Sequence, residues 1–213
     1  MNTVYTNTYD APEFNMKEIL RYAGVRESRG ELEALLSSCI KEIKGRLTYK
    51  VCYSEFPISL CGELLDLGFI RTESRGLKKN LEGCESVVLF AATVGIEIDR
   101  LIARNASLSP AKALFFQAIG AERIESLCDT FNRDIADRKA LEGYAARPRF
   151  SAGYGDFKLE AQKEIFAALD CPRRIGLSLN ESLLMSPSKS VTAIIGFAKT
   201  KKTDNTGENN EDN

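Results

Sequence analysis

The stretch SVVLFAAT, residues 86–93, decides the fold class of this chain. Positions 87–92 are all apolar, and an unbroken apolar run of this length predicts a central strand that is covered on both faces. Downstream, Ser109 and Pro110 open a long helix expected to reach about Ile135, because serine is a favoured N-cap and proline suits the first helical position. Together the two segments predict a helix packed on a buried sheet.

The other expected elements mix helices and strands without a strict strand–helix–strand alternation. Apolar residues at helical spacing predict helices over residues 16–23, 32–47, 96–104 and 159–169. Alternating or continuous apolar runs predict strands over residues 49–54, 69–72, 175–179, 183–185 and 190–198. Asp156 is expected to cap the last helix, Pro172 to stop it, and residues 136–157 to form a long connection. This order predicts an α+β fold, with a mixed or antiparallel sheet packed with helices.

A change in composition near the C-terminus marks the expected domain boundary. Residues 1–198 carry the apolar patterns of a single domain. Within it, polar and apolar residues alternate over 49–54, which predicts a half-buried strand. Residues 199–213 read KTKKTDNTGENNEDN, a polar segment that cannot repay the entropy of ordering. We therefore expect one domain over 1–198 and a disordered tail over 199–213.

Composition excludes several classes of function. The 213 residues carry a net charge of −1, so the chain lacks the basic surface that nucleic-acid binding requires. It has neither an apolar stretch long enough to span a membrane nor a secretion signal at its start, so we expect a cytoplasmic protein. The chain has no histidine, which removes the commonest general base and the commonest metal ligand. We expect no metal site, and any chemistry must use carboxylates, arginine, lysine, tyrosine, cysteine, backbone groups or a borrowed cofactor.

The six cysteines point to the same absence of metal. None forms a Cys-x-x-Cys pair, and most lie inside apolar runs such as LLSSCI. Buried free thiols are therefore expected, rather than a zinc site or a disulfide framework.

The segment RFSAGYGD, residues 149–156, is the first candidate binding loop. Gly153 and Gly155 flank Tyr154 and allow backbone conformations that bring the chain close to a ligand. Arg149 supplies a planar guanidinium suited to a carboxylate. The alternative is a tight turn with a surface arginine and a packed tyrosine.

Glu125 is the second candidate, on the long helix. It shares a helix side with Ala118, Ala121 and Cys128, so we expect its carboxylate to be partly buried and to need a partner. A cationic ligand or Arg149 could provide that partner. The alternative is an exposed residue on the flank of the helix.

The segment LNESLLMSPSKSV, residues 179–191, is the third candidate. It joins two expected strands through a serine-rich turn that could hold an anion, although a hairpin-like connection explains it equally well.

Taken together, the paired motifs resemble the activation domain of vitamin B12 (cobalamin)-dependent methionine synthase. That family has Arg-x-x-x-Gly-Tyr, followed by Thr-Glu-Ser-x-x-Met-x-Pro-x-x-Ser-Val, and the order and approximate spacing match over residues 125–196. The layout is similar to the shorter, free-standing members of the family. The resemblance implies an activation-domain fold.

The resemblance also implies site residues for S-adenosylmethionine. Arg149 would hold the ligand carboxylate, Ser151 would contact the ligand through its backbone, and Tyr154 would lie near the reacting methyl group. Glu125 would lie near the ligand, and Gly153, Glu181 and Ser182 would have supporting positions. The family's Cys-Pro-Asp-His stretch and its C-terminal Tyr-Tyr strand have no counterpart here.

The function implied is that of an accessory component and not of a complete enzyme. The chain would bind S-adenosylmethionine and support reductive methylation of cob(II)alamin, with the cobalamin carried by a partner chain. That partner would be cobalamin-dependent methionine synthase or another corrinoid protein, and flavodoxin or ferredoxin would donate the electron. The alternative is a non-catalytic docking protein, or an S-adenosylmethionine sensor, for a corrinoid methyltransferase.

Overall fold

A five-stranded antiparallel sheet forms the centre of the molecule in this computed structural model, which describes residues 2–25 and 30–200. Its strands are ordered β1-β2-β6-β10-β7. Their bounds are β1 Tyr5–Tyr9, β2 Tyr49–Pro57, β6 Cys84–Thr93, β10 Ser190–Lys199 and β7 Tyr144–Ala146. Val88 on β6 lies between Glu55 of β2 and Ile195 of β10, so the predicted central strand is confirmed.

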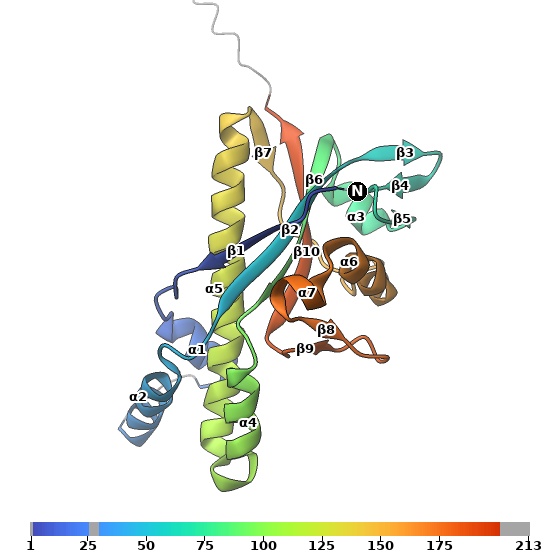
Figure 1. Cartoon of the computed structure of the whole chain (residues 1–213). Helices are drawn as coiled ribbons and strands as arrows, with labels where there is room; N and C mark the ends of the chain where they lie inside the picture. Colours follow the sequence, from blue (N-terminus) through green and yellow to red (C-terminus); the bar gives the residue numbers. More distant parts are fainter. Residues whose placement is uncertain (1, 26–29, 201–213) are drawn as a thin grey trace, which may run out of the picture.

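Helices cover one face of this sheet. Their bounds are α1 Met16–Tyr22, α2 Glu31–Ile43, α4 Glu97–Leu108 and α5 Pro110–Leu141. Figure 1 shows α5 running along the whole sheet on this side. Val88, Phe90 and Ile195 point from the sheet into the core that α5 closes with Leu127 and Phe131. Burial of these side chains, each worth about 1.5–3 kcal/mol, holds the helix on the sheet.

Smaller elements cover the opposite face. Their bounds are β3 Ser59–Cys61, β4 Leu64–Asp66, β5 Arg71–Thr72, α3 Arg75–Asn80, η1 Leu159–Ala161, α6 Gln162–Leu169, α7 Cys171–Ile175, β8 Ser178–Leu179 and β9 Met185–Ser186. Val87, Leu89 and Ile194 alternate with the residues of the first core and pack here against Ile165 and Leu77. The sheet is therefore covered on both faces, as the run at 87–92 predicts, and the α+β prediction is confirmed.

Several boundaries differ from the predictions. The strand predicted as half-buried over 49–54 is buried at all positions but Lys50, because β2 lies between two other strands under both cores. Only Arg71–Thr72 of residues 69–72 is a strand. The strand predicted over 175–179 shrinks to Ser178–Leu179, because Ile175 ends α7.

The connection predicted over residues 136–157 is wrong for its first half, whereas residues 147–157 are irregular apart from a bridge at Phe150. Helix α5 continues to Leu141, and the chain then returns as β7 along β10. At the C-terminal end of the domain, Lys199 still pairs with Tyr144, and the Thr200 amide donates to the Gly143 carbonyl at 2.8 Å. The tail prediction is therefore wrong for Lys199, and residues 201–213 lie outside the described part of the chain.

The cysteines agree in part with the predicted buried free thiols. Four cysteines are buried as free thiols, but Cys61 is exposed and Cys84 is half-buried. In the described ranges, with their gap at 26–29, no helix is both long and apolar enough to cross a membrane.

Candidate functional site

Arg149 lies on the edge of the central sheet and faces α5. Phe150 forms an antiparallel bridge with Ile194 of β10, with amide–carbonyl distances of 2.9 and 2.8 Å in the two directions. Side chains alternate along an extended segment, so the Phe150 ring packs into the core under α6 while the Arg149 side chain turns toward α5. The bridge thus determines which face of the sheet receives the guanidinium.

Two carboxylates of α5 hold this guanidinium. Its Nη1 donates to Oδ1 of Asp129 at 2.7 Å, and its Nη2 donates to a carboxylate oxygen of Glu125. The two acids are four residues apart and share a helix side. The structure therefore brings the predicted residues Arg149 and Glu125 together, and it adds Asp129, which the sequence did not single out.

The electrostatics of this group, which we call the Arg149 cluster (Arg149, Glu125 and Asp129), leave an excess of negative charge. One guanidinium faces two carboxylates, for a formal charge of −1, and the Arg149 side chain is 25% exposed. Burial works to lower the pKa of Arg149, but the hydrogen bond to Asp129 and neighbouring negative groups outweigh it, so the pKa is raised. The guanidinium stays charged at every physiological pH, and the open cluster suits a ligand that carries positive charge.

Tyr154 occupies the tip of the glycine-flanked loop. Gly153 and Gly155 both have positive φ, +87° and +57°. The positive φ of Gly153 favours glycine, and a Cβ there would also press on Leu159 Cδ1 at 3.1 Å. The Tyr154 side chain is 70% exposed, and its ring meets the Phe150 ring edge-on at 5.5 Å. Tyr154 therefore lies on the Phe150 side of the edge, next to the Arg149 cluster in sequence but on the opposite face.

The loop backbone is partly used by the loop itself. The Ser151 carbonyl accepts from the Tyr154 amide at 3.1 Å, and the Gly153 amide donates to the Phe157 carbonyl at 2.7 Å. Ser151 is half-buried. These bonds make the loop rigid, which is a requirement for a preformed binding segment.

Asp156 does not cap the helix that follows it, and that prediction is wrong. Its carboxylate instead crosses to α3, accepting from the Ser74 hydroxyl at 2.6 Å, the Arg75 amide at 2.7 Å and the Gly76 amide at 3.1 Å. These donors, the Ser74 hydroxyl first, lower the pKa of Asp156 below its ordinary value of 3.8. The carboxylate thus fastens the loop over residues 149–156 to the N-terminus of α3.

Glu181 and Ser182 lie away from this arrangement, on the exposed turn between β8 and β9. Among the contacts of the described chain, neither forms a hydrogen bond with Arg149 or Glu125. The rest of the second motif is anchored elsewhere: the Ser188 amide donates to Asp99 at 3.0 Å, and Lys189 Nζ donates to Gln117 Oε1 at 2.5 Å. This motif joins β10 to α4 and α5.

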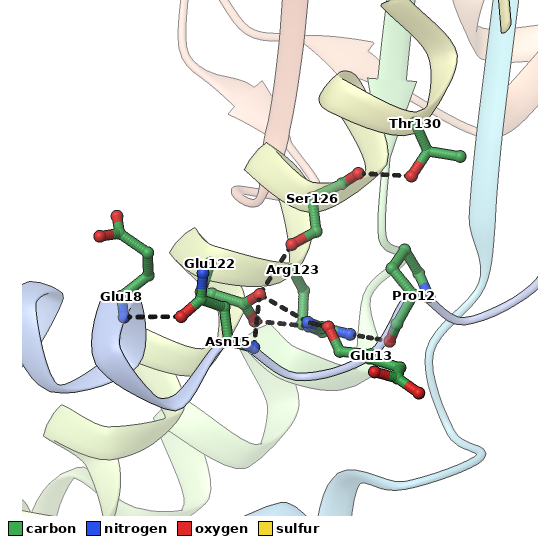
Figure 2. Close-up of polar contacts among 8 residues, drawn as sticks. All are labelled: Pro12, Glu13, Asn15, Glu18, Glu122, Arg123, Ser126 and Thr130. Atoms are coloured by element: carbon green, nitrogen blue, oxygen red, sulfur yellow. Dashed lines mark hydrogen bonds and ion pairs between the residues drawn. The ribbon is translucent and has the colours of Figure 1, made fainter. Parts of the chain in front are cut away.

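A buried ion pair on α5 was missed by the sequence predictions (Figure 2). Arg123 and Glu122 are 0% and 2% exposed, with Nε to Oε2 at 2.6 Å. Arg123 also donates to the carbonyls of Pro12 and Glu13, and Glu122 accepts from the Ser126 hydroxyl at 2.7 Å. We call this group the Glu122–Arg123 pair; it fastens the N-terminal segment to α5.

A signal for this pair was present in the sequence. Arg123 lies four residues from both Ile119 and Leu127, which belong to the core stripe of the helix. A charge in such a stripe is buried and must find partners.

The described residues contain no group of three or more side chains that could hold a metal ion, so we assign none. The Arg149 cluster is partly open to solvent, because the side chains of Arg149, Glu125 and Asp129 are 25%, 41% and 63% exposed.

Comparison with known proteins gives one clear result. No protein-family model matches the sequence, and no curated protein matches it. Among solved structures, the crystal structure of the MetH reactivation domain bound to AdoHcy is similar, with a TM-score of 0.64 and 15% sequence identity. The match covers 94% of this chain and 80% of that chain. The resemblance predicted from the paired motifs is thus confirmed at the level of structure: this chain has the fold of the MetH reactivation domain.

Proposed function

We propose that this chain binds S-adenosylmethionine and acts as a reactivation subunit for a cobalamin-dependent methionine synthase or a similar corrinoid protein. The fold match over 94% of the chain supports this, since the matched domain is bound to AdoHcy, the molecule that remains when S-adenosylmethionine loses its methyl group. Cobalamin would be carried by the partner chain, and flavodoxin or ferredoxin would supply the electron.

The observation that carries the proposal is the Arg149 cluster. S-adenosylmethionine has one carboxylate and two positive groups, an ammonium and a sulfonium. The partly exposed guanidinium of Arg149 offers donors for the carboxylate, while Glu125 and Asp129 provide the excess negative charge that the positive groups need. The residues present therefore fit this ligand better than they fit a simple anion.

The protein's contribution to the reaction would be positioning. The bound ligand would supply a methyl group to the reduced corrinoid of the partner chain. Arg149 fixes one end of the ligand. The glycine-flanked loop, fastened to α3 by Asp156, holds the exposed Tyr154 on the other face of this edge, so a ligand that contacts both residues has to extend around the edge. Holding two reactants in line removes much of the entropic cost of a transfer between two proteins. No side chain of this chain needs to act as a general acid or base.

Calorimetry and a reactivation assay together test the proposal. We expect the chain to bind S-adenosylmethionine and, with a reductant, to restore activity to methionine synthase inactivated as cobalt(II). Replacing Tyr154 with alanine should lower the rate of recovery at least about tenfold if the ring shapes the reacting end. Replacing Tyr22 with alanine, a partly exposed tyrosine on α1, is the matched control and should change nothing.

A second candidate function is favoured by one specific observation. The guanidinium of Arg149 is already held by two carboxylates, so a ligand carboxylate has to compete with them. A chain that does not handle the ligand would be a docking protein for a corrinoid methyltransferase. Binding without recovery of activity would indicate an S-adenosylmethionine sensor, and neither binding nor recovery would indicate the docking protein.

A further inference from the structure

A hollow of about 650 Å³ lies between the β3–β4 hairpin and α3. Figure 1 shows this hairpin projecting from the central sheet beside α3, on the side away from α5. Small-molecule sites have volumes of about 300–1,000 Å³, so the hollow has room for a compact organic ligand. Its lining excludes Arg149, Glu125 and Tyr154, so it is independent of the proposed function.

Much of the lining is apolar. Leu65 and Leu81 are buried beneath the hollow, and Ile58 and Cys84 are half-buried beside it. Leu60 on β3 is 62% exposed and also lines it. A ligand with an apolar body would remove this surface from water, which is favourable in proportion to the area covered.

The rest of the lining is cationic. Arg75, Lys78 and Lys79 of α3 all line the hollow, with Glu82 as the one acid. Each cation is exposed, and among the described residues none of them forms an ion pair. Beside the rim, Arg147 donates to the Glu82 carbonyl at 2.9 Å and adds a fourth positive charge.

These two properties select one class of ligand. An inorganic anion would neutralise the cations but leave the leucines exposed, and a neutral apolar molecule would leave the cations unpaired. We propose that the hollow binds an organic anion with an apolar body, such as a medium-chain carboxylate or phosphate ester. The apolar body lies against Leu60 and Leu65, and the acidic group meets the cations of α3.

Calorimetry on the full chain with hexanoate, octanoate and decanoate tests the apolar half of the proposal. Each buried methylene should tighten binding about fourfold, so two carbons should give roughly a fifteenfold gain. Decyltrimethylammonium has the same body with the opposite charge and should not bind. Affinity that does not depend on chain length would overturn the proposal.

Charge reversal tests the cationic half. The double variant Lys78→Glu/Lys79→Glu should weaken decanoate binding at least about tenfold. Lys41→Glu/Lys44→Glu, on and just after α2, makes the same charge change far from the hollow and should bind as wild type does. Equal binding by wild type and both double variants, or no binding by any of them, would contradict the proposal.

The labelling rate of the Cys84 thiol gives a second measurement that requires no substitution of a residue that lines the hollow. Cys84 lines it, and burial raises the pKa of this thiol, so it should react slowly with a disulfide reagent. With the exposed Cys61 replaced by serine, decanoate should slow the labelling of Cys84 further. Unchanged labelling at saturating decanoate would place the ligand elsewhere and overturn the proposal.

Sedimentation with phosphatidylglycerol vesicles distinguishes a free organic anion from a lipid headgroup as the ligand of the hollow. If the ligand is a free organic anion, decanoate should bind and the chain should stay in the supernatant. Co-sedimentation without decanoate binding would assign the hollow to a lipid headgroup at a surface and would refute a soluble ligand.

Discussion

Helix α5 contributes to two groups of charged side chains, the Glu122–Arg123 pair and, three residues further along, the Arg149 cluster. The two groups differ in their surroundings. In the Glu122–Arg123 pair, both side chains are almost wholly buried, and both carboxylate oxygens and all three donor nitrogens have partners within the protein. In the Arg149 cluster, a single cation faces two acids at a partly exposed edge. A closed, neutral group can only hold the fold together, whereas an open group with unbalanced charge can bind a ligand.

The largest expected effect comes from breaking the buried pair. Replacing Glu122 with glutamine leaves the Arg123 charge buried without its counter-ion, which should cost about 3–5 kcal/mol of unfolding free energy in urea titration. The double replacement Glu122→Leu/Arg123→Met removes both charges and should cost much less. Equal losses in the single and double variants would show that side-chain packing, and not charge pairing, explains the effect.

Removing Arg149 should affect ligand binding strongly and stability only slightly, the reverse of what is expected for the buried pair. Arg149→Ala should weaken S-adenosylmethionine binding by about 2–3 kcal/mol, because charge-assisted hydrogen bonds to the carboxylate are lost. Its effect on unfolding free energy should stay below about 1 kcal/mol, as for other partly exposed ion pairs. Arg173→Ala, which removes an exposed partner of Asp170, is the control. Unchanged affinity in calorimetry would exclude Arg149 from the site.

A smaller effect should follow from removing one of the two acids of the Arg149 cluster. Asp129 is 63% exposed, so its ion pair with Arg149 is worth roughly 0.2–1 kcal/mol. Asp129→Asn removes negative charge that the positive groups of the ligand need and should weaken binding up to about fivefold. Tighter binding in calorimetry would mean that Asp129 competes with the ligand's carboxylate for Arg149 more than it attracts the positive groups.

The smallest effect should come from Asp156 and should be confined to acidic solution. The folded state lowers the pKa of Asp156 below 3.8, so the carboxylate stabilises the fold above that value and loses its contribution as pH falls through the lowered pKa. Asp156→Asn should therefore reduce the dependence of stability on pH in this acid range. NMR titration of the carboxyl group measures the shift directly, and an ordinary pKa would contradict the prediction.

The parts of the fold that could be predicted are those in which local pattern and tertiary position agree. The apolar run at 87–92 specifies a strand buried on both faces wherever it lies, and Ile124, Leu127 and Phe131 mark the core side of α5. The end of α5 was missed because none of residues 136–141 is buried, so the apolar stripe of the helix ends at Ile135. The ion pair between Asp134 and Arg138 and the high helix propensity of alanine, arginine and leucine are the signals that extend it to Leu141.

The candidate site could be predicted only in part. Arg149 was a candidate partner for Glu125 because a half-buried carboxylate requires a cation, and the two are indeed bonded. The contact of Asp156 with α3 joins segments 80 residues apart, and no local pattern encodes it. Besides Glu122, the partners of Arg123 are the backbone carbonyls of Pro12 and Glu13. Every residue has a backbone carbonyl, so no side-chain pattern identifies these two.

The bridge between Phe150 and Ile194 has a consequence for how the length of the chain can vary. Because side chains alternate along an extended strand, deleting one residue between β7 and this bridge would exchange the two sides and send the guanidinium into the core under α6. Related proteins should therefore keep a constant number of residues between β7 and the arginine. The exposed turn between β8 and β9 has no such requirement and should accept insertions freely.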